Sequence, residues 1–231
     1  MRIPLTKYGW PEVAIYPAAI LAVIVIVGAA SGSFLPVLAG IVVEPVLVIL
    51  FVFSLMFFRD PRRAGPQDGK LLLSPADGRI TDVETVYEND FIGGSALKIG
   101  IFLSIFDAHI NRAPCNVRVE KITYKKGKYT NAANPRSAKV NESNELALVR
   151  TDSPKDRLIV RQISGAIARR IVCAATMGQE LVAGEKFGMI KFGSRTELYA
   201  PQTDSIKCLV HVGQKVKAGL TPLLRYEQCE K

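Results

Sequence analysis

The sequence predicts a mainly β protein: a compact, β-sandwich-like domain with few short helices, preceded by an N-terminal hydrophobic helical hairpin. Three observations predict this architecture. From Val13 to Phe58 the only charged side chain is Glu44. From Arg59 onward the composition changes abruptly to a polar linker and then to short apolar runs. The runs are about four to eight residues long, rich in Val and Ile and separated by turn residues, which is typical of strands.

The apolar N-terminal segment is too long for one helix across a bilayer, which needs about 20 residues. Its middle, AASGSFLP at residues 29–36, contains the small residues and the proline of a break. Two membrane-anchoring helices are therefore expected, at about 12–31 and 35–58. Basic residues flank the pair on both sides: Lys7 before it, and Arg59, Arg62 and Arg63 after it. The positive-inside rule then puts both flanks, and the domain that follows, on the cytoplasmic side of the cell membrane.

Glu44–Pro45 is unusual within a full membrane span. Either Glu44 faces the partner helix, or the hairpin dips into one leaflet without crossing. A cleaved signal peptide does not fit, because the apolar stretch far exceeds a signal core.

Residues 59–231 are expected to form the β-rich domain after a Pro- and Gly-rich linker, RDPRRAGPQDGK. The pattern leaves room for a short helix near 180–183 or around 106–110. Residues 125–157 are dense in Lys, Asn, Ser and Pro and predict a long solvated loop, whose basic residues could lie over a bilayer surface.

Composition narrows the function classes. The net charge of +9 indicates an anionic partner, and the hydropathy favours a membrane over nucleic acid. The cysteines are scattered and only two histidines are present, so neither a metal site nor a disulfide framework is expected. The cysteines are predicted to be reduced: Cys115, Cys173, Cys208 and Cys229.

Four stretches occur in an order that resembles the phosphatidylserine decarboxylase family, in its short, membrane-anchored proenzyme form. They are LLLSPADGRI (71–80), IFLSIFDAHINRAPC (101–115), RQISGAIARRIVC (161–173) and GMIKFGSRTELYAP (188–201). The resemblance covers residues 59 to about 224.

The resemblance implies a self-cleaving enzyme. The Ser194 hydroxyl would attack the carbonyl of Gly193, and cleavage would leave a β chain (1–193) and an α chain (194–231). Ser194 would become a pyruvoyl group, which forms a Schiff base with the substrate, so no metal or diffusible cofactor is implied. A glycine before the serine suits this step, because it does not obstruct attack and tolerates a strained backbone.

The same resemblance makes His109 the base and acid, and Asp77 the residue that orients it. His211 lies in the alternating run CLVHV and is expected to be structural, in a strand. Longer family members have a second histidine three residues after the first, where this chain has Arg112. Either His109 serves both self-cleavage and decarboxylation, or another group performs one of them.

The implied substrate is phosphatidylserine in an anionic membrane, with Lys191 and Arg195 as basic residues near the scissile bond that could meet its phosphodiester. Archaetidylserine, with the same headgroup on an ether-linked lipid, stays an alternative. Two further alternatives are a non-enzymatic, membrane-tethered β-sandwich adaptor and a soluble pyruvoyl-dependent amino acid decarboxylase. The first normally has a long helical insertion that is lacking here, and the second leaves the apolar segment unexplained. The sequence leaves open whether the protein is a homo-oligomer.

Overall fold

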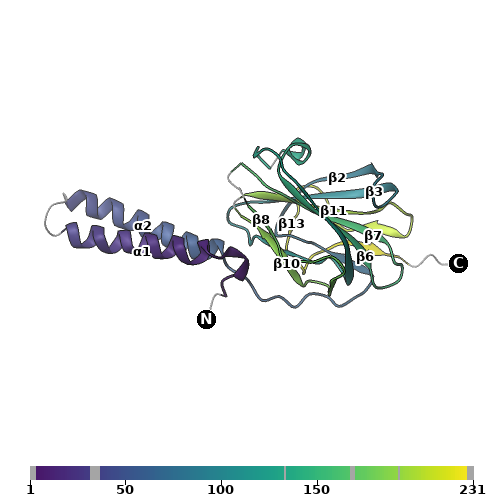
Figure 1. Cartoon of the computed structure of the whole chain (residues 1–231), viewed down its shortest axis with the longest axis horizontal. Coiled ribbons are helices and arrows are strands. Elements are labelled where there is room, and N and C mark those ends of the chain that lie inside the picture. The colour runs from purple at the N-terminus through teal and green to yellow at the C-terminus, as the bar shows by residue number, and fades with distance from the viewer. Residues whose placement is uncertain (1–3, 32–36, 133, 167–169, 192, 228–231) are drawn as a thin grey trace. The chain divides into compact units, whose positions relative to one another are not determined.

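The computed structural model describes residues 4–31, 37–132, 134–166, 170–191 and 193–227 (Figure 1). The chain divides into two compact units, Met1–Pro61 and Arg62–Lys231. The first is helical, and the second contains all of the described strands and one short 3-10 helix.

The N-terminal unit is a pair of apolar helices that lie side by side (Figure 1). A short 3-10 helix, η1 (Lys7–Gly9), precedes α1 (Glu12–Ser31) and α2 (Val37–Phe57). Both helices are long and apolar enough to cross a membrane. The predicted hairpin of apolar helices is thus confirmed, although residues 32–36 of the predicted break lie outside the described residues.

Glu44 faces the partner helix. A Cβ added to Gly28 of α1 would lie 3.3 Å from Glu44 Oε1. The carboxylate therefore lies against the small residue of α1, as the first of the two alternatives for Glu44 expects.

The second unit has short strands, which begin and end near the predicted apolar runs. The strands are β1 (Leu71–Leu73), β2 (Gly78–Glu88), β3 (Gly94–Leu103), β4 (Ile110–Arg112), β5 (Val117–Lys125), β6 (Ser143–Arg150), β7 (Arg157–Ile163), β8 (Ile171–Cys173), β9 (Glu180–Leu181), β10 (Lys186–Ile190), β11 (Ser194–Pro201), β12 (Ile206–Cys208), β13 (Lys215–Val216) and β14 (Pro222–Tyr226). The mainly β fold class is confirmed.

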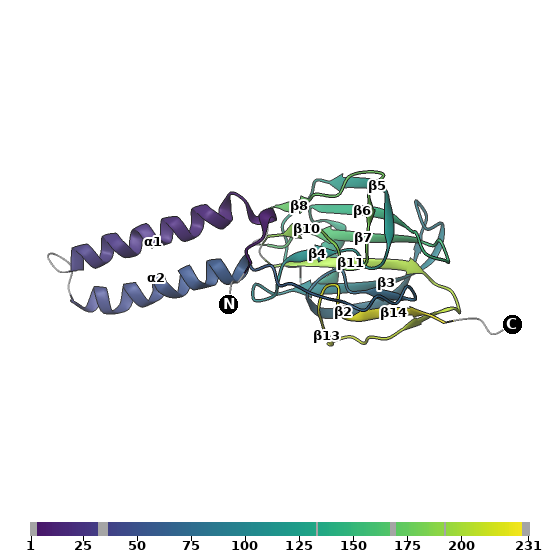
Figure 2. The same ribbon diagram turned by 90° about the horizontal axis from the view of Figure 1, so that it is seen from below.

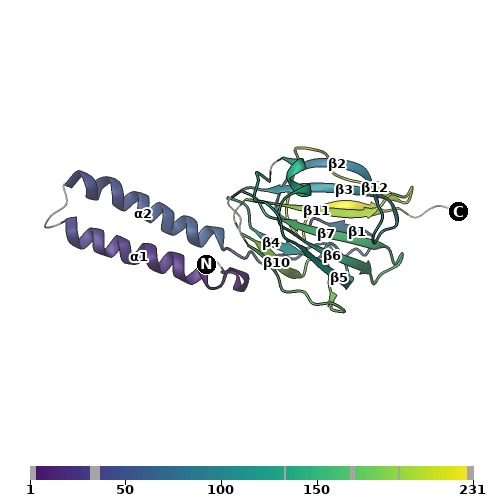
Figure 3. The same cartoon turned by 45° about the horizontal axis from the view of Figure 1, so that its top comes forward.

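One curled sheet of eight strands dominates this unit, in the order β13-β2-β3-β11-β7-β6-β5-β9. Every neighbouring pair in it is antiparallel. Figures 2 and 3 show the long strands β2, β3, β11, β7, β6 and β5 side by side in this order. Two smaller sheets, β1-β14-β12 and β4-β10-β8, complete the unit.

The hydrophobic core lies on one face of the large sheet. Side chains alternate between the two faces of a strand, and in β11 the residues Leu198 and Ala200 enter the core with Ile99 and Ile101 of β3 and Val160 of β7. Ser194 and Thr196 share that face because they are an even number of residues away. Arg195, Glu197 and Tyr199 point to the opposite face.

Three predictions about local structure are wrong. Residues 106–110 form a turn that leads into β4, and residues 180–181 form strand β9, so neither is helical. The segment 125–157 contains strand β6 and a 3-10 helix, η2 (Pro135–Lys139), so only part of it is loop. His211 is exposed and follows β12 in a loop, because the strand ends at Cys208.

Candidate active site

Gly193–Ser194 lies where β11 begins. Ser194 pairs with Leu103, the last residue of β3. Gly193 has a φ of +59°, in the left-handed region that glycine enters without a steric penalty. A side chain at this position would be strained, which gives the glycine of the dipeptide a structural reason.

The hydroxyl of Ser194 is buried without a partner. The residue is 0% exposed, and its Oγ has no hydrogen bond within the part of the chain that the structure describes. A buried polar group without a partner costs about 1–3 kcal/mol of stability. Such groups are uncommon in folded proteins, and a nucleophilic one is a candidate for chemistry.

His109 lies next to the backbone of Gly193. Its Nε2 accepts a hydrogen bond from the Gly193 N–H (3.3 Å), and its Nδ1 lies 2.9 Å from the carbonyl oxygen of Asp107. A carbonyl can only accept, so Nδ1 bears the proton, and the Nε2 lone pair is directed at Gly193. A neutral imidazole with a lone pair beside the reacting peptide has the form that a general base requires.

A turn after β3 brings His109 to this place. The carboxylate of Asp107 accepts bonds from the backbone N–H and the hydroxyl of Ser104, each at 2.8 Å. The Asp107 N–H donates to the Ser104 carbonyl (2.9 Å). The chain thus reverses directly after Leu103, the partner of Ser194, and His109 follows the reversal. The Ile190 N–H then donates to the His109 carbonyl at 3.2 Å, which attaches the histidine to β10.

Gly165 packs against the carbonyl of Gly193. A Cβ added to Gly165 would lie 1.9 Å from the Gly193 oxygen and 3.2 Å from Ala132 Cβ. The neighbouring Ser164 is fixed by three bonds: its N–H and its Oγ donate to the Glu142 carbonyl, and its own carbonyl accepts from Asn141 Nδ2. The backbone at Gly165 therefore limits the positions that the Gly193 carbonyl can take.

Four buried polar side chains connect the strands below the site. Asn144 donates to Gln162 (3.0 Å), Gln162 to Asn111 (2.9 Å) and Asn111 to Thr196 (3.0 Å). Asn111 is two residues from His109, and Thr196 is two residues from Ser194. This amide chain therefore ties the strand of the histidine to the strand of the serine.

Sequence reasoning did not single out Gly165 or the amide chain. Gly165 lies inside the stretch RQISGAIARRIVC, so that stretch contained a signal. For the amide chain the only local signal is Gln162, a polar residue near the end of the apolar run RLIVRQI.

Asp77 lies in the SPADG turn and is paired elsewhere. Its carboxylate forms a bidentate ion pair with Arg63 and accepts the Ala218 N–H at 2.8 Å. Arg63 also donates to the Ala218 carbonyl. Within the described residues, none of the Asp77 hydrogen bonds goes to His109. The Nδ1 atom of His109 bonds the Asp107 carbonyl instead. The structure thus brings Ser194, Gly193 and His109 together, and Asp77 contacts a neighbouring loop.

Arg112, in place of the second histidine, is buried at the end of β4. Its Nη1 donates to the Gly184 carbonyl at 2.9 Å.

Lys191 and Arg195, whose roles the sequence leaves open, are both buried. Lys191 is 3% exposed and Arg195 is 0% exposed. Arg195 donates to Asp82 (2.8 Å), Glu197 (2.9 Å) and the Thr81 hydroxyl (2.6 Å) on the outer face of the sheet. Burial opposes ionisation of Asp82, but hydrogen bonds from Arg195 and Thr81 and the charges of Arg195 and Lys98 outweigh it and lower the pKa of Asp82. Burial likewise opposes the charge of Arg195, and Glu197 and Asp82 outweigh it and raise the Arg195 pKa.

No group of three or more His, Cys, Asp or Glu side chains suited to a metal ion occurs among the residues that the structure describes.

Comparison with known proteins shows to which family the chain belongs. The sequence profile of the phosphatidylserine decarboxylase family matches residues 50–223. A phosphatidylserine decarboxylase proenzyme of Carboxydothermus hydrogenoformans is 40% identical over 228 residues, which cover 97% of this chain and 99% of the relative. Proenzymes of the same name from Symbiobacterium thermophilum (40% identity; 99% of each chain) and Rhodopirellula baltica (39%; 98% of this chain and 90% of the relative) are similar over comparable lengths.

Proposed function

The chain belongs to the phosphatidylserine decarboxylase family, and we propose that it decarboxylates phosphatidylserine to phosphatidylethanolamine after cutting itself between Gly193 and Ser194. The observation that carries the self-cleavage is the buried Ser194 hydroxyl, which has no partner in the described structure and adjoins a left-handed glycine. The word proenzyme in the names of the relatives agrees with a processed chain. Family membership also argues against a non-enzymatic adaptor.

In the proposed first step, His109 removes the proton of Ser194 Oγ, and the oxygen attacks the carbonyl carbon of Gly193. The C–N bond breaks, the nitrogen of residue 194 becomes an amine, and an ester joins the two halves. The Gly193 N–H bond to His109 Nε2 and the contact of Gly165 with the Gly193 oxygen support this geometry. Near-attack positioning of this kind is worth several orders of magnitude in rate.

In the second step the α-proton of residue 194 is removed and the bond from Cβ to the ester oxygen breaks, which releases Gly193 as a carboxylate. Addition of water to the remaining enamine releases ammonia and leaves a pyruvoyl group at the start of the α chain. That group supplies a ketone for the substrate amine and a sink for the electrons that carbon dioxide leaves behind. We expect His109, whose Nε2 accepts the Gly193 N–H, to return a proton to the product carbon.

Asp77 enters the proposal indirectly. Its partners Arg63 and Ala218 hold the SPADG turn, and the Pro75 carbonyl of that turn accepts the Arg112 N–H at 3.0 Å. We expect Asp77 to stabilise the strand that follows His109 and not to bond the imidazole itself.

The helical pair supports a membrane location. We propose that α1 and α2 anchor the protein with both ends in the cytoplasm, since both are long and apolar and basic residues flank them. Anchoring would raise the concentration of the catalytic unit at the lipid surface, where the substrate lies.

The deciding experiment is the intact mass of the full-length protein, purified in detergent, together with a denaturing gel. We expect two pieces, residues 1–193 and 194–231, with the second lighter by one ammonia than the unmodified fragment. Ser194→Ala should remain one chain, and Ser95→Ala, which changes the serine of another Gly-Ser pair, should be cut normally. An intact wild-type chain that releases carbon dioxide from phosphatidylserine at full rate would contradict self-cleavage. Parallel assays with ether-linked archaetidylserine decide between the two lipids.

A further inference from the structure

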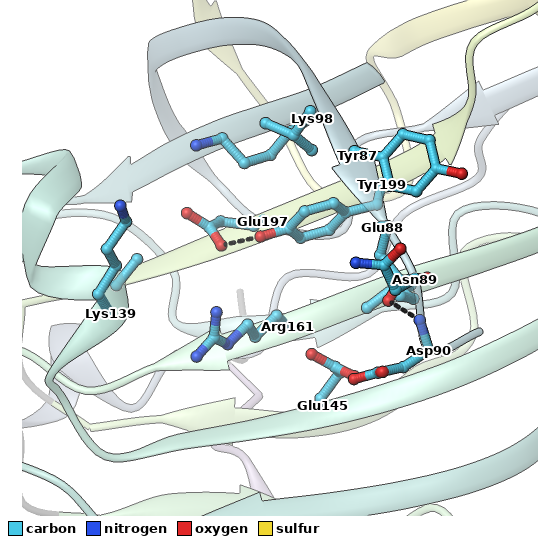
Figure 4. Close-up of a pocket in the computed structure, with 13 residues that line it drawn as sticks. Tyr87, Glu88, Asn89, Asp90, Lys98, Lys139, Glu145, Arg161, Glu197 and Tyr199 are labelled. Carbon is cyan, nitrogen blue, oxygen red and sulfur yellow. Dashed lines mark hydrogen bonds between the residues drawn. The ribbon is translucent and has the colours of Figure 1, made fainter. Parts of the chain in front are cut away.

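A pocket lies on the face of the large sheet opposite to Ser194. It has a volume of about 390 Å³, within the range of small-molecule sites. Its floor is formed by β3, β11, β7 and β6, and the β2–β3 hairpin and η2 form its sides (Figure 4). Its lining includes Asn89, Asp90, Lys98, Lys139, Glu145 and Arg161.

Two cations of this pocket lack carboxylate partners. Arg161 is half-buried and donates to the Ser143 hydroxyl at 3.2 Å, with no carboxylate at ion-pair distance among the described residues. Lys139 likewise has no ion-pair partner in the described part of the chain. Lys98, in contrast, is paired with Glu84 and Asp82. The planar guanidinium of Arg161 and the nearby ammonium of Lys139 form a pair of donors suited to phosphate or carboxylate.

Glu145 adds a negative charge to the lining of the same pocket. It lies directly opposite Arg161 on the neighbouring strand, yet no ion pair joins them. It is half-buried, and its carboxylate has no hydrogen bond within the described residues. Burial raises the pKa of Glu145. The positive charge of Arg161 opposes this shift, the negative charges of Glu88 and Asp90 add to it, and the net shift of the Glu145 pKa is upward. Glu88 itself is occupied, because its carboxylate accepts the backbone N–H groups of Asp90 and Phe91.

The charges are separated across the pocket. Figure 4 shows the charged ends of Lys98, Lys139 and Arg161 toward one side and the carboxylates of Glu145 and Asp90 toward the other. Glu197, between the cations, forms an ion pair with Arg195 and accepts a hydrogen bond from the hydroxyl of Tyr199 (2.7 Å). The open charges are thus two cations at one end and Glu145 with Asp90 at the other.

From this arrangement we infer a binding site for a small, water-soluble zwitterion, in which a phosphate or carboxylate is joined by a short linker to an ammonium group. Arg161 and Lys139 bind the anionic group, and Glu145 and Asp90 bind the ammonium. The site is separate from the proposed reaction at Ser194, because the two lie on opposite faces of β11. It therefore does not depend on the proposed function.

The test is calorimetric titration of the full-length protein in detergent with three probes: O-phosphoethanolamine, inorganic phosphate and ethanolamine. We expect the zwitterion to bind at least tenfold more tightly than either single-charge probe. Arg161→Gln should weaken the binding of O-phosphoethanolamine and of phosphate at least tenfold. Glu145→Gln should weaken the binding of the zwitterion and leave the binding of phosphate unchanged. Lys207→Gln, an exposed cation on β12, is the matched control and should change neither.

Two further measurements keep the outcome decisive. Ser194→Ala should bind O-phosphoethanolamine as the wild type does, which separates this pocket from the catalytic site. Arg161→Lys, with a melting temperature measured beside it, replaces Arg161→Gln if the latter does not fold. Absence of zwitterion binding at millimolar concentration, or binding that Arg161 variants leave unchanged, would overturn the inference.

Discussion

The two faces of strand β11 place neighbouring polar residues in opposite situations. Ser194 and Arg195 are both 0% exposed. Ser194 Oγ has no hydrogen bond within the described residues, whereas Arg195 bonds Asp82, Glu197 and Thr81. One face of the strand therefore carries an unsatisfied nucleophile, and the other carries a fully paired charge.

This difference separates reactivity from stability. A paired buried charge fixes the strand, because removal of one partner leaves the other charged and desolvated. An unpaired hydroxyl weakens the fold slightly but is available to react. We infer that the outer face holds β11 in place so that the inner face can present Ser194 to Gly193. Four predictions test this comparison, beginning with the largest expected effect.

Loss of the base should have the largest effect on the inner face. His109→Gln removes the Nε2 acceptor beside Gly193, and general bases contribute about 10²–10⁴ in rate. We expect self-cleavage to slow by at least 100-fold, measured by gel over time after synthesis. Asp77 bonds Arg63 and not the imidazole, so Asp77→Asn should slow cleavage less than His109→Gln does. If Asp77→Asn slows cleavage as much as His109→Gln does while folding normally, Asp77 acts on the base directly.

On the outer face, Asp82→Asn should reduce stability strongly. The substitution leaves the buried guanidinium of Arg195 without its bidentate partner, which typically costs about 3–5 kcal/mol. The Asp82 pKa is lowered in the fold, so this stabilisation is present above the pKa of an unfolded aspartate and is lost as the pH falls through the folded value. Chemical denaturation should therefore show a large difference from wild type at neutral pH that shrinks in acid. Glu227→Gln, which breaks the exposed pair with Lys207, is the control and should cost below about 1 kcal/mol.

The contact on the scissile carbonyl provides a third test. In Gly165→Ala the new Cβ would meet the Gly193 oxygen, so the carbonyl must shift. A displacement of about 1 Å can reduce a rate by about 100-fold. We expect cleavage to slow by that order, whereas Gly94→Ala, whose Cβ has no atom within 4 Å, should be cut normally. Equal cleavage of the two variants would remove Gly165 from the site.

The strands and the helical pair could be predicted because each depends on neighbouring residues. Apolar runs of strand length and a long uncharged segment are visible within a short window of sequence. The Gly193–Ser194 site is predicted from the order of four short stretches, since Gly-Ser alone is too common to be informative.

What the sequence could not predict depends on residues that are far apart along the chain. Arg195 was expected to be accessible because its charge, and not its burial, is visible in the sequence. Its guanidinium is accommodated because Gly100 on the neighbouring strand has no side chain: a Cβ there would lie 1.9 Å from Arg195 Nη2. The amide chain from Asn144 to Thr196 joins four strands and has no local pattern. The sequence left room for helices at 106–110 and 180–183, but the chain forms a turn and a strand there. Short apolar segments do not distinguish a turn, a strand and a helix.

The smallest expected effect is the most direct test of the comparison: the Ser194 hydroxyl should contribute nothing favourable to stability. Because wild type is expected to cut itself, the measurement belongs in a His109→Gln background that keeps the chain whole. There, Ser194→Ala removes a buried oxygen that has no described partner, so the free energy of unfolding should stay the same or rise by up to about 1 kcal/mol. Ser164→Ala is the matched control, since Ser164 is equally buried but its Oγ donates to the Glu142 carbonyl at 3.1 Å. It should lose about 1 kcal/mol. If Ser194→Ala destabilises the uncut chain as much as Ser164→Ala does, the Ser194 hydroxyl has a partner in solution. The contrast between the two faces of β11 would then not hold.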